Sequence, residues 1–110
     1  MRYEELPPIG RAEFVAACET GDGRHRAEAI LRLALHDGDP TFIEQASVAL
    51  FDDDDVEVRR GAVLSVGHLA RLHGRVTEET LTRLRALALD ATLAGTVSDA
   101  LDDVAIFTRT

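Results

Sequence analysis

The chain is most informative between residues 51 and 70, where it reads FDDDDVEVRRGAVLSVGHLA. The four consecutive aspartates can accept hydrogen bonds from the unpaired amides of a helix start, and their charge suits the positive end of the helix dipole. Apolar residues then follow at helical spacing and form one stripe: Val58, Ala62, Val66 and Leu69. The stretch therefore predicts an acidic turn and then a long helix over about 56–73, which Gly74 would end.

The rest of the chain follows the same period of about 3.6 residues, and no stretch of strand length alternates between apolar and polar residues. Between the periodic segments stand Gly21, which suits the left-handed position after a helix, Gly38, and the start signal Asp39-Pro40. The predicted helices span about 11–19, 24–36, 40–51, 56–73, 78–89 and 93–107, after an extended segment over 1–10.

An internal repeat predicts how these helices pack. When the sequence is shifted by 33 residues, HRAEAILRLA at 25–34 lies over VRRGAVLSVG at 58–67, and Arg26 aligns with Arg59. Periods of this size are typical of helical hairpins that stack into a solenoid, because one hairpin cannot bury its apolar face alone. The sequence therefore predicts an all-α fold, a short α-solenoid of about three helical hairpins in one domain over 1–110. The hairpins are expected at about 11–36, 40–73 and 78–107.

The segment 51–70 resembles the HEAT-repeat pattern, in which an acidic turn is followed by Val-Arg and then by small and apolar residues at helical spacing. Asp53, Val58-Arg59 and Ala62 match the turn aspartate, the Val-Arg pair and the small packing residue of that family. The resemblance implies a HEAT-like right-handed stack and a binding or scaffolding role, although a few HEAT-like relatives are lyases or DNA glycosylases. The run GHLARLH at 67–73 and the small size also resemble compact HEAT-like immunity proteins to bacterial toxins.

The chain is acidic, since 20 Asp and Glu against 12 basic residues, all of them Arg, leave a formal net charge of −8. Residues 1–55 hold 13 acids and 5 Arg, a net of −8, whereas residues 56–110 hold 7 of each, a net of zero. Such a surface repels phosphate backbones and anionic lipids, which disfavours nucleic acid and membranes and favours a basic protein partner. With no signal-peptide order, no apolar run of about 20 residues and a single cysteine, the chain is expected to be cytoplasmic.

No pattern in the sequence supports catalysis. It contains no glycine-rich phosphate loop, serine elbow or Cys-His motif, and the acidic run lacks the alternation and the glycine of a calcium loop. His68 and His73 would point about 140° apart around a helix instead of toward one metal ion. Cys18 falls on the apolar side of a short helix, where a buried structural thiol is expected. We therefore expect no enzymatic activity, no cofactor and no metal site.

The acidic turn is the first candidate partner-binding site. Capping a helix needs one or two carboxylates, whereas this turn holds five within six residues: Asp52, Asp53, Asp54, Asp55 and Glu57. A concentrated acidic edge would speed encounter with a basic partner and make the association sensitive to salt. The alternative is a solvated turn whose acids only cap the helix.

The second candidate lies on the helix over 56–73, on the half of the helical wheel opposite Val58. The residues on this half are Arg60, Leu64, Gly67, His68 and Arg71. An exposed leucine among arginines is typical of a small binding patch, and Gly67 would let a partner approach closely. The alternative is pairing within the fold, because a shift of 35 residues aligns Leu64 and His68 with Asp99 and Asp103. Arg and Asp of neighbouring helices could then pair across the stack, each pair contributing about 0–1 kcal/mol.

These observations favour a non-enzymatic protein-binding module, most concretely an immunity protein that binds and neutralises a basic bacterial toxin domain. A toxin that acts on a polyanion, such as a nuclease or a deaminase, would present a basic site that an acidic inhibitor can cover. One alternative is a general HEAT-repeat scaffold or adaptor. Another is a HEAT-like enzyme acting on DNA or tetrapyrrole, which would need a basic groove or a catalytic acid in a cleft. The sequence predicts no oligomeric state.

Overall fold

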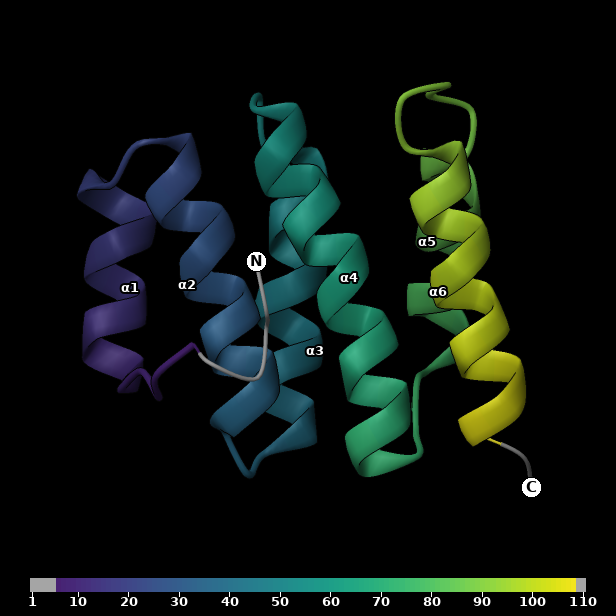
Figure 1. The fold of residues 1–110 in the computed structure, drawn as a ribbon, viewed down its shortest axis with the longest axis horizontal. Helices are drawn as coiled ribbons and strands as arrows, with labels where there is room; N and C mark the ends of the chain where they lie inside the picture. Colours follow the sequence, from purple (N-terminus) through teal and green to yellow (C-terminus); the bar gives the residue numbers. More distant parts are fainter. Residues whose placement is uncertain (1–5, 109–110) are drawn as a thin grey trace.

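The computed structural model describes residues 6–108, and these residues form an all-α fold (Figure 1). The helices are α1 (Arg11–Thr20), α2 (Gly23–His36), α3 (Pro40–Ala49), α4 (Val56–His73), α5 (Glu78–Leu87) and α6 (Ala94–Phe107), with a short 3₁₀ helix, η2 (Leu50–Asp52), after α3. The predicted all-α class is confirmed, and each α-helix begins within one residue of its predicted start. An extended segment was expected over 1–10. Residues 1–5 of it lie outside the described residues, and residues 6–10 are not helical.

The helices form two layers. Helices α2, α4 and α6 lie side by side, while α3 and α5 lie behind them and α1 closes one end beside α2 (Figure 1). Consecutive helices pack as pairs, α1 with α2, α3 with α4 and α5 with α6. Helix α4 is the centre of the fold because it packs against α2, α3 and α6. The result is a stack of helix pairs, which is the arrangement of an α-solenoid.

Apolar side chains fill two clusters that meet at α4. One cluster draws on η2, α4, α5 and α6 and includes Phe51, Val66 and Leu84. The other draws on α1, α2 and α3 and includes Ile30 and Ile43, with Leu69 reaching it from α4. The whole predicted stripe of α4, from Val58 to Leu69, is fully buried. Burying a side chain of this size contributes about 1.5–3 kcal/mol, so α4 holds the two halves of the stack together.

The helix ends follow the predicted signals, with one exception. Asp39 caps α3, since its carboxylate accepts hydrogen bonds from the amides of Thr41 and Phe42, and Gly74 ends α4 with a left-handed φ of 68°. The expected left-handed conformation of Gly21 is wrong, because its φ is −76° and the extended chain passes directly into the cap of α2. A glycine fits there because a Cβ would lie 2.5 Å from the carbonyl oxygen of Ala17.

The repeated arginines link each helix pair to the next. Arg26 donates two hydrogen bonds to the carboxylate of Asp53, at 3.0 and 3.1 Å, and a third to the carbonyl oxygen of Gly21. Arg59, its equivalent one repeat later, donates to the carbonyl oxygen of Asp53 at 2.7 Å and pairs with the carboxylate of Asp90 at 3.5 Å. In both repeats, an arginine near the start of a helix reaches the turn before that helix and also the turn of the following pair.

Candidate protein-binding surface

The first candidate site, which we call the acidic edge, consists of Asp52, Asp53, Asp54, Asp55 and Glu57. It lies where the chain leaves η2 and enters α4. The five carboxylates do not share one role, because two of them are used within the fold and three are turned to solvent.

Asp53 and Asp55 hold the turn together. The side chain of Asp53 is only 14% exposed, receives both hydrogen bonds from Arg26 and accepts another from the amide of Asp55 at 2.9 Å. Hydrogen bonding to the Arg26 guanidinium holds the pKa of Asp53 below its ordinary value. Asp55 caps α4, since its carboxylate accepts a hydrogen bond from the amide of Glu57 at 2.8 Å. These two carboxylates are therefore engaged within the fold.

Asp52, Asp54 and Glu57 are the exposed members of the acidic edge. The side chain of Asp52 is 78% exposed and pairs with Arg83 at 2.6 Å, and that of Glu57 is 61% exposed and contacts Arg60 one turn further along α4. Asp54 is also exposed. Exposed ion pairs of this kind contribute little to stability, because both charges remain solvated. A basic partner can therefore compete for these carboxylates.

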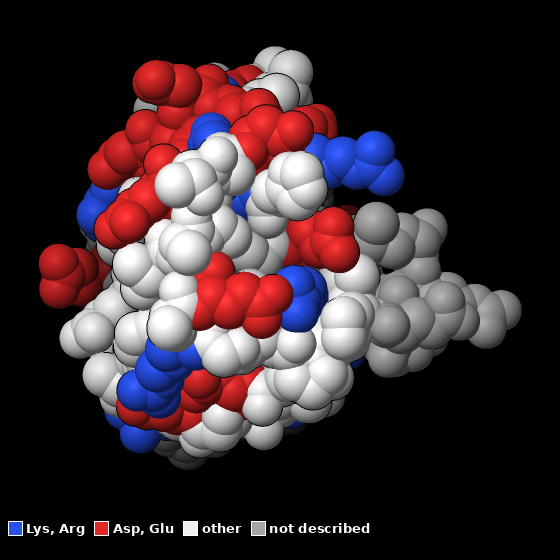
Figure 2. Space-filling model, turned by 90° about the vertical axis from the view of Figure 1, so that its left-hand side faces the viewer, with Lys and Arg blue, Asp and Glu red and all other residues white. Residues whose placement is uncertain are grey.

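Sequence reasoning missed one acid that the fold brings to the same edge. Asp22 caps α2 and its side chain is 69% exposed. The start of α2 lies against the start of α4, since a Cβ on Gly23 would collide with the carboxylate of Asp55. Figure 2 shows acidic side chains gathered at the top of the molecule when it is viewed from the α1 end. The signal was in the sequence, because the 33-residue repeat aligns Asp22 with Asp55.

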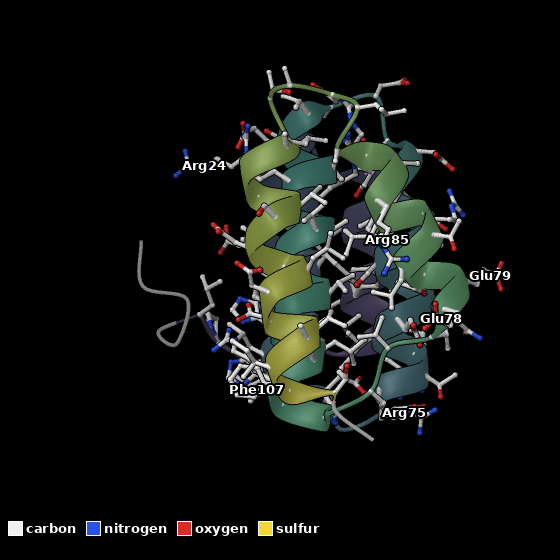
Figure 3. All side chains as sticks on the ribbon, turned by 90° about the vertical axis from the view of Figure 1, so that its right-hand side faces the viewer. Arg24, Arg75, Glu78, Glu79, Arg85 and Phe107 are labelled. Carbon is white, nitrogen blue, oxygen red and sulfur yellow. The ribbon has the colours of Figure 1, made fainter. Side chains whose placement is uncertain are left out.

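The end of the stack formed by α5 and α6 carries charges of both signs. Figure 3 shows Glu78, Glu79 and Arg85 on α5, with Arg75 just before this helix, and Phe107 where α6 ends. The side chain of Phe107 is 45% exposed. Residues 1–55 have a net charge of −8 and residues 56–110 a net of zero, so the first half of the chain carries the whole excess of negative charge.

The second candidate site lies on α4 between two grooves. One groove, of about 570 Å³, separates α2 from α4 and is bordered on the α4 side by Arg60 and Leu64. The other, of about 390 Å³, separates α4 from α6 and is lined by Leu64, His68 and Arg71. The structure therefore brings Arg60, Leu64, His68 and Arg71 to one face of the α2–α4–α6 layer. Leu64 borders both grooves.

Burial on this face differs from the expectation. The predicted outward exposure of His68 is wrong, because this residue is only 7% exposed at the contact with α6. Gly67 is buried as well, and a Cβ there would lie 3.0 Å from a carboxylate oxygen of Asp103, so its missing side chain makes room for α6 and not for a partner. Arg71 pairs with Asp103 at 4.0 Å, which is the pairing across the stack that the alternative predicted.

The environment of His68 makes it a neutral residue. Burial, and to a smaller extent the positive charge of Arg71, lower the pKa of His68 to about 4. The uncharged ring can then accept a hydrogen bond at Nδ1 from the Arg71 guanidinium that contacts it. His68 therefore contributes polar packing beside α6 and no charge to this face near neutral pH.

Among residues 6–108, no group of three His, Cys, Asp or Glu side chains is placed to hold a metal ion. Cys18, expected to be buried, is half-buried, and desolvation raises the pKa of its thiol, which disfavours the thiolate that a nucleophile needs. Within the same range, no helix is both long and apolar enough to cross a membrane.

The fold and this surface define an all-helical stack of helix pairs with one acidic edge and one grooved face. A solved structure then gives the relationship. The chain belongs to the same family as a chain in the crystal structure of a CDI complex from Cupriavidus taiwanensis LMG 19424. The two chains are 32% identical, the alignment covers 99% of each, and the TM-score is 0.86.

Comparison with protein-family models gives no match, and comparison with curated proteins also gives none. The HEAT resemblance therefore rests on the residues of the acidic turn and on the stacked helix pairs.

Proposed function

We propose that this chain is an immunity protein that binds and neutralises a basic bacterial toxin domain. The observation that carries the proposal is the match, over 99% of both chains, to a chain of a CDI complex. Contact-dependent inhibition complexes contain a toxin and an immunity protein. A small, acidic, all-helical chain suits the second of these roles.

The charge distribution supports a basic partner. Asp52, Asp54 and Glu57 project from the acidic edge, and Asp22 adds a further exposed carboxylate beside it. The field of such an edge speeds encounter with a basic protein and is screened over about 8–10 Å at physiological salt. A toxin that acts on a polyanion, such as a nuclease or a deaminase, needs a basic site. Acids that cover that site would exclude the substrate by competition.

A HEAT-like architecture, a cytoplasmic location and the lack of enzymatic activity are parts of the same proposal. The repeated contacts of Arg26 and Arg59 with the turns support the HEAT-like interpretation, since Asp53 and Arg59 are among the residues that carry the resemblance. An inhibitor that acts by covering a site needs no catalytic group of its own. It must also be present where the toxin meets its polyanionic substrate.

The test is capture of a partner followed by neutralisation. The tagged chain is incubated at moderate salt with a lysate of its source organism, and proteins that co-purify in equal amounts are identified. Each such partner is then produced in a bacterial host with and without this chain. We expect one basic domain that stops growth alone and no longer does so when the chain is present. Several weakly held and harmless partners would contradict the proposal and favour the general HEAT-repeat adaptor.

A further inference from the structure

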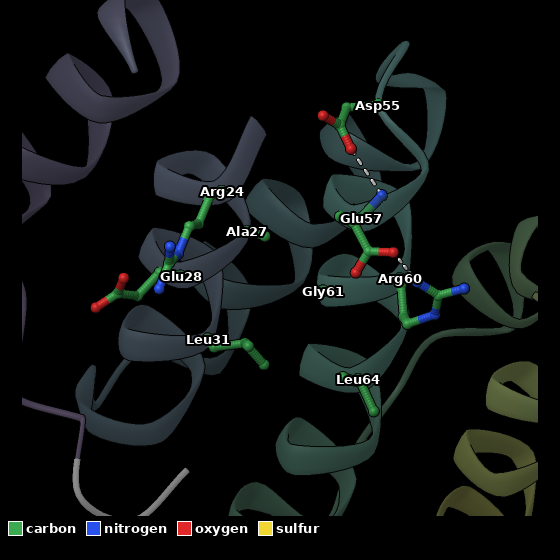
Figure 4. A pocket seen from close by; sticks show the side chains of 9 residues that line it. All are labelled: Arg24, Ala27, Glu28, Leu31, Asp55, Glu57, Arg60, Gly61 and Leu64. Carbon is green, nitrogen blue, oxygen red and sulfur yellow. Dashed lines mark hydrogen bonds and ion pairs between the residues drawn. The ribbon is translucent and has the colours of Figure 1, made fainter. Parts of the chain in front are cut away.

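The groove between α2 and α4 has an apolar floor. Ala27 and Gly61 form this floor, and Leu31 of α2 and Leu64 of α4 stand on its two sides (Figure 4). Ala27 and Leu64 are half-buried, so part of their apolar surface remains in contact with solvent.

This hollow exists because α2 and α4 approach each other at two small residues. A Cβ on Gly61 would lie 3.2 Å from the carbonyl oxygen of Ala27 and 3.4 Å from its Cβ. The helices are therefore already in contact at the floor, and neither carries a side chain there that could fill the space above it. The fold itself leaves apolar surface uncovered at this point.

Charge at the groove is concentrated at the end where α4 begins. Asp55 and Glu57 line that end, and both belong to the acidic edge. Arg60 does not neutralise it fully, because its guanidinium points away from α2 and donates to the carbonyl oxygen of Thr92 as well as contacting Glu57 (Figure 4). On the α2 side, Arg24 and Glu28 line the groove with opposite charges. The apolar floor therefore opens toward an acidic end.

From this juxtaposition we infer that the α2–α4 groove is the anchor site for the toxin, and that it receives a segment with an apolar side chain flanked by Arg or Lys. The inference rests on the proposed function and assigns the chemistry of its contact. The apolar side chain covers Ala27 and Leu64, and the basic residue lies at the exposed carboxylate of Glu57, beside Asp55. Desolvated anchors in such hollows supply most of the binding energy of an interface, while charges at the rim steer the encounter.

Two substitutions test the anchor site. Leu64→Ala shortens one side of the groove, and Ala27→Trp fills it. The matched control is Ala49→Trp, because Ala49 lines a groove of about 430 Å³ between α3 and α5, in the other layer. Affinity for the purified toxin domain recovered by the capture experiment is measured by calorimetry, and circular dichroism checks folding. We expect both groove variants to lower the affinity by about tenfold or more, and the control to change it by less than about twofold.

The two proposals fail in different ways. If the wild-type chain neutralises the toxin and both groove variants bind it as tightly as the wild type, the groove assignment is wrong and the function stands. If the wild-type chain binds no toxin, the function is wrong and the groove assignment falls with it. Should Ala27→Trp not fold, amide hydrogen exchange in the wild-type complex takes its place. Unchanged exchange over residues 24–31 and 57–64 would then overturn the assignment.

Discussion

Asp53 and Asp54 are adjacent and chemically identical, but they differ in what they touch. The carboxylate of Asp53 receives two hydrogen bonds from Arg26, whereas Asp54 is exposed. We therefore expect Asp53→Asn to lower the free energy of unfolding by about 1.5–3 kcal/mol, because a charge-assisted contact between two helix pairs is lost. Asp54→Asn is the control and should change it by less than about 0.5 kcal/mol. Urea denaturation of both variants measures the difference, and equal effects would contradict this assignment of roles.

The same contact makes stability depend on pH. Since Arg26 lowers the pKa of Asp53 in the folded state, the unfolded chain takes up this proton more readily than the native one. The stabilisation is therefore fully present above the unfolded value of about 3.9, and it is lost as the pH falls through the lower native pKa. We expect the acid-induced loss of stability below about pH 4 to be smaller in Asp53→Asn than in the wild type. Urea denaturation over a series of acidic pH values is the measurement.

His68 gives a second pH dependence, in a higher range. Its native pKa of about 4 lies below the unfolded value of 6.5, so below pH 6.5 the unfolded chain binds a proton that the native state does not. The free energy of unfolding should therefore fall by up to about 3 kcal/mol between about pH 6.5 and 4. The contribution of His68 to this fall should level off at lower pH. In His68→Gln the decline over this interval should be shallower. An NMR titration of the wild type that shows His68 charged at pH 6 would contradict the prediction.

At the scale of the helices, two glycines on α4 should respond in opposite ways to the same change. Inside a helix, replacing glycine by alanine stabilises the helix by about 1 kcal/mol. At Gly67 the new Cβ would meet the carboxylate of Asp103, a flexible group that can move aside, whereas at Gly61 it would press on the backbone of α2 at Ala27. We expect Gly67→Ala to leave stability unchanged or raised, and Gly61→Ala to lower it by about 1 kcal/mol or more. Thermal unfolding of the two variants is the comparison, and equal shifts would mean that α2 and α4 can separate freely.

The limit of sequence reasoning lies at this same scale. The helices were predictable because their ends carry strong local signals, such as the cap at Asp39, and because apolar residues recur with a helical period. The burial of His68 was not predictable, because a helical wheel assumes one buried side, whereas α4 packs against three helices. Ser65 shows the same limit: it is fully buried, and its hydroxyl donates to the carbonyl oxygen of Gly61 within α4, which no apolar pattern reveals.

The candidate site was predictable only in part, for a related reason. The acidic turn is contiguous in sequence, so its five acids could be found directly. Which of them remain exposed depends on Arg26, which lies 27 residues away from Asp53. The α2–α4 groove depends on the packing of Ala27 against Gly61, two positions whose contact the repeat alone does not predict. Contacts between repeats, and not the repeats themselves, therefore determine which residues a partner can reach.

At the scale of the whole molecule, the uneven charge should govern how fast a basic partner associates. The variant that tests this is Asp52→Asn/Asp54→Asn/Glu57→Gln, which removes three exposed charges and leaves Asp53 and Asp55 to hold the turn. Its association rate with the toxin domain should fall by about tenfold at low salt, because steering by the acidic edge is weakened. The difference should disappear near 1 M salt, where the screening length is about 3 Å. Stopped-flow measurements over a range of salt concentrations give both quantities.

A loss of net charge anywhere on the molecule would also slow association to some degree, so the position of the charges has to be tested separately. Glu78→Gln/Glu79→Gln/Asp102→Asn is the matched control, since it removes the same number of exposed acids from α5 and α6. Because these residues lie on α5 and α6 and do not belong to the acidic edge, we expect their charges to act less strongly on a partner that docks at that edge. We expect this control to slow association by less than about twofold. If both variants slow it equally, total charge and not the acidic edge steers the partner, and the edge has no particular role in recognition.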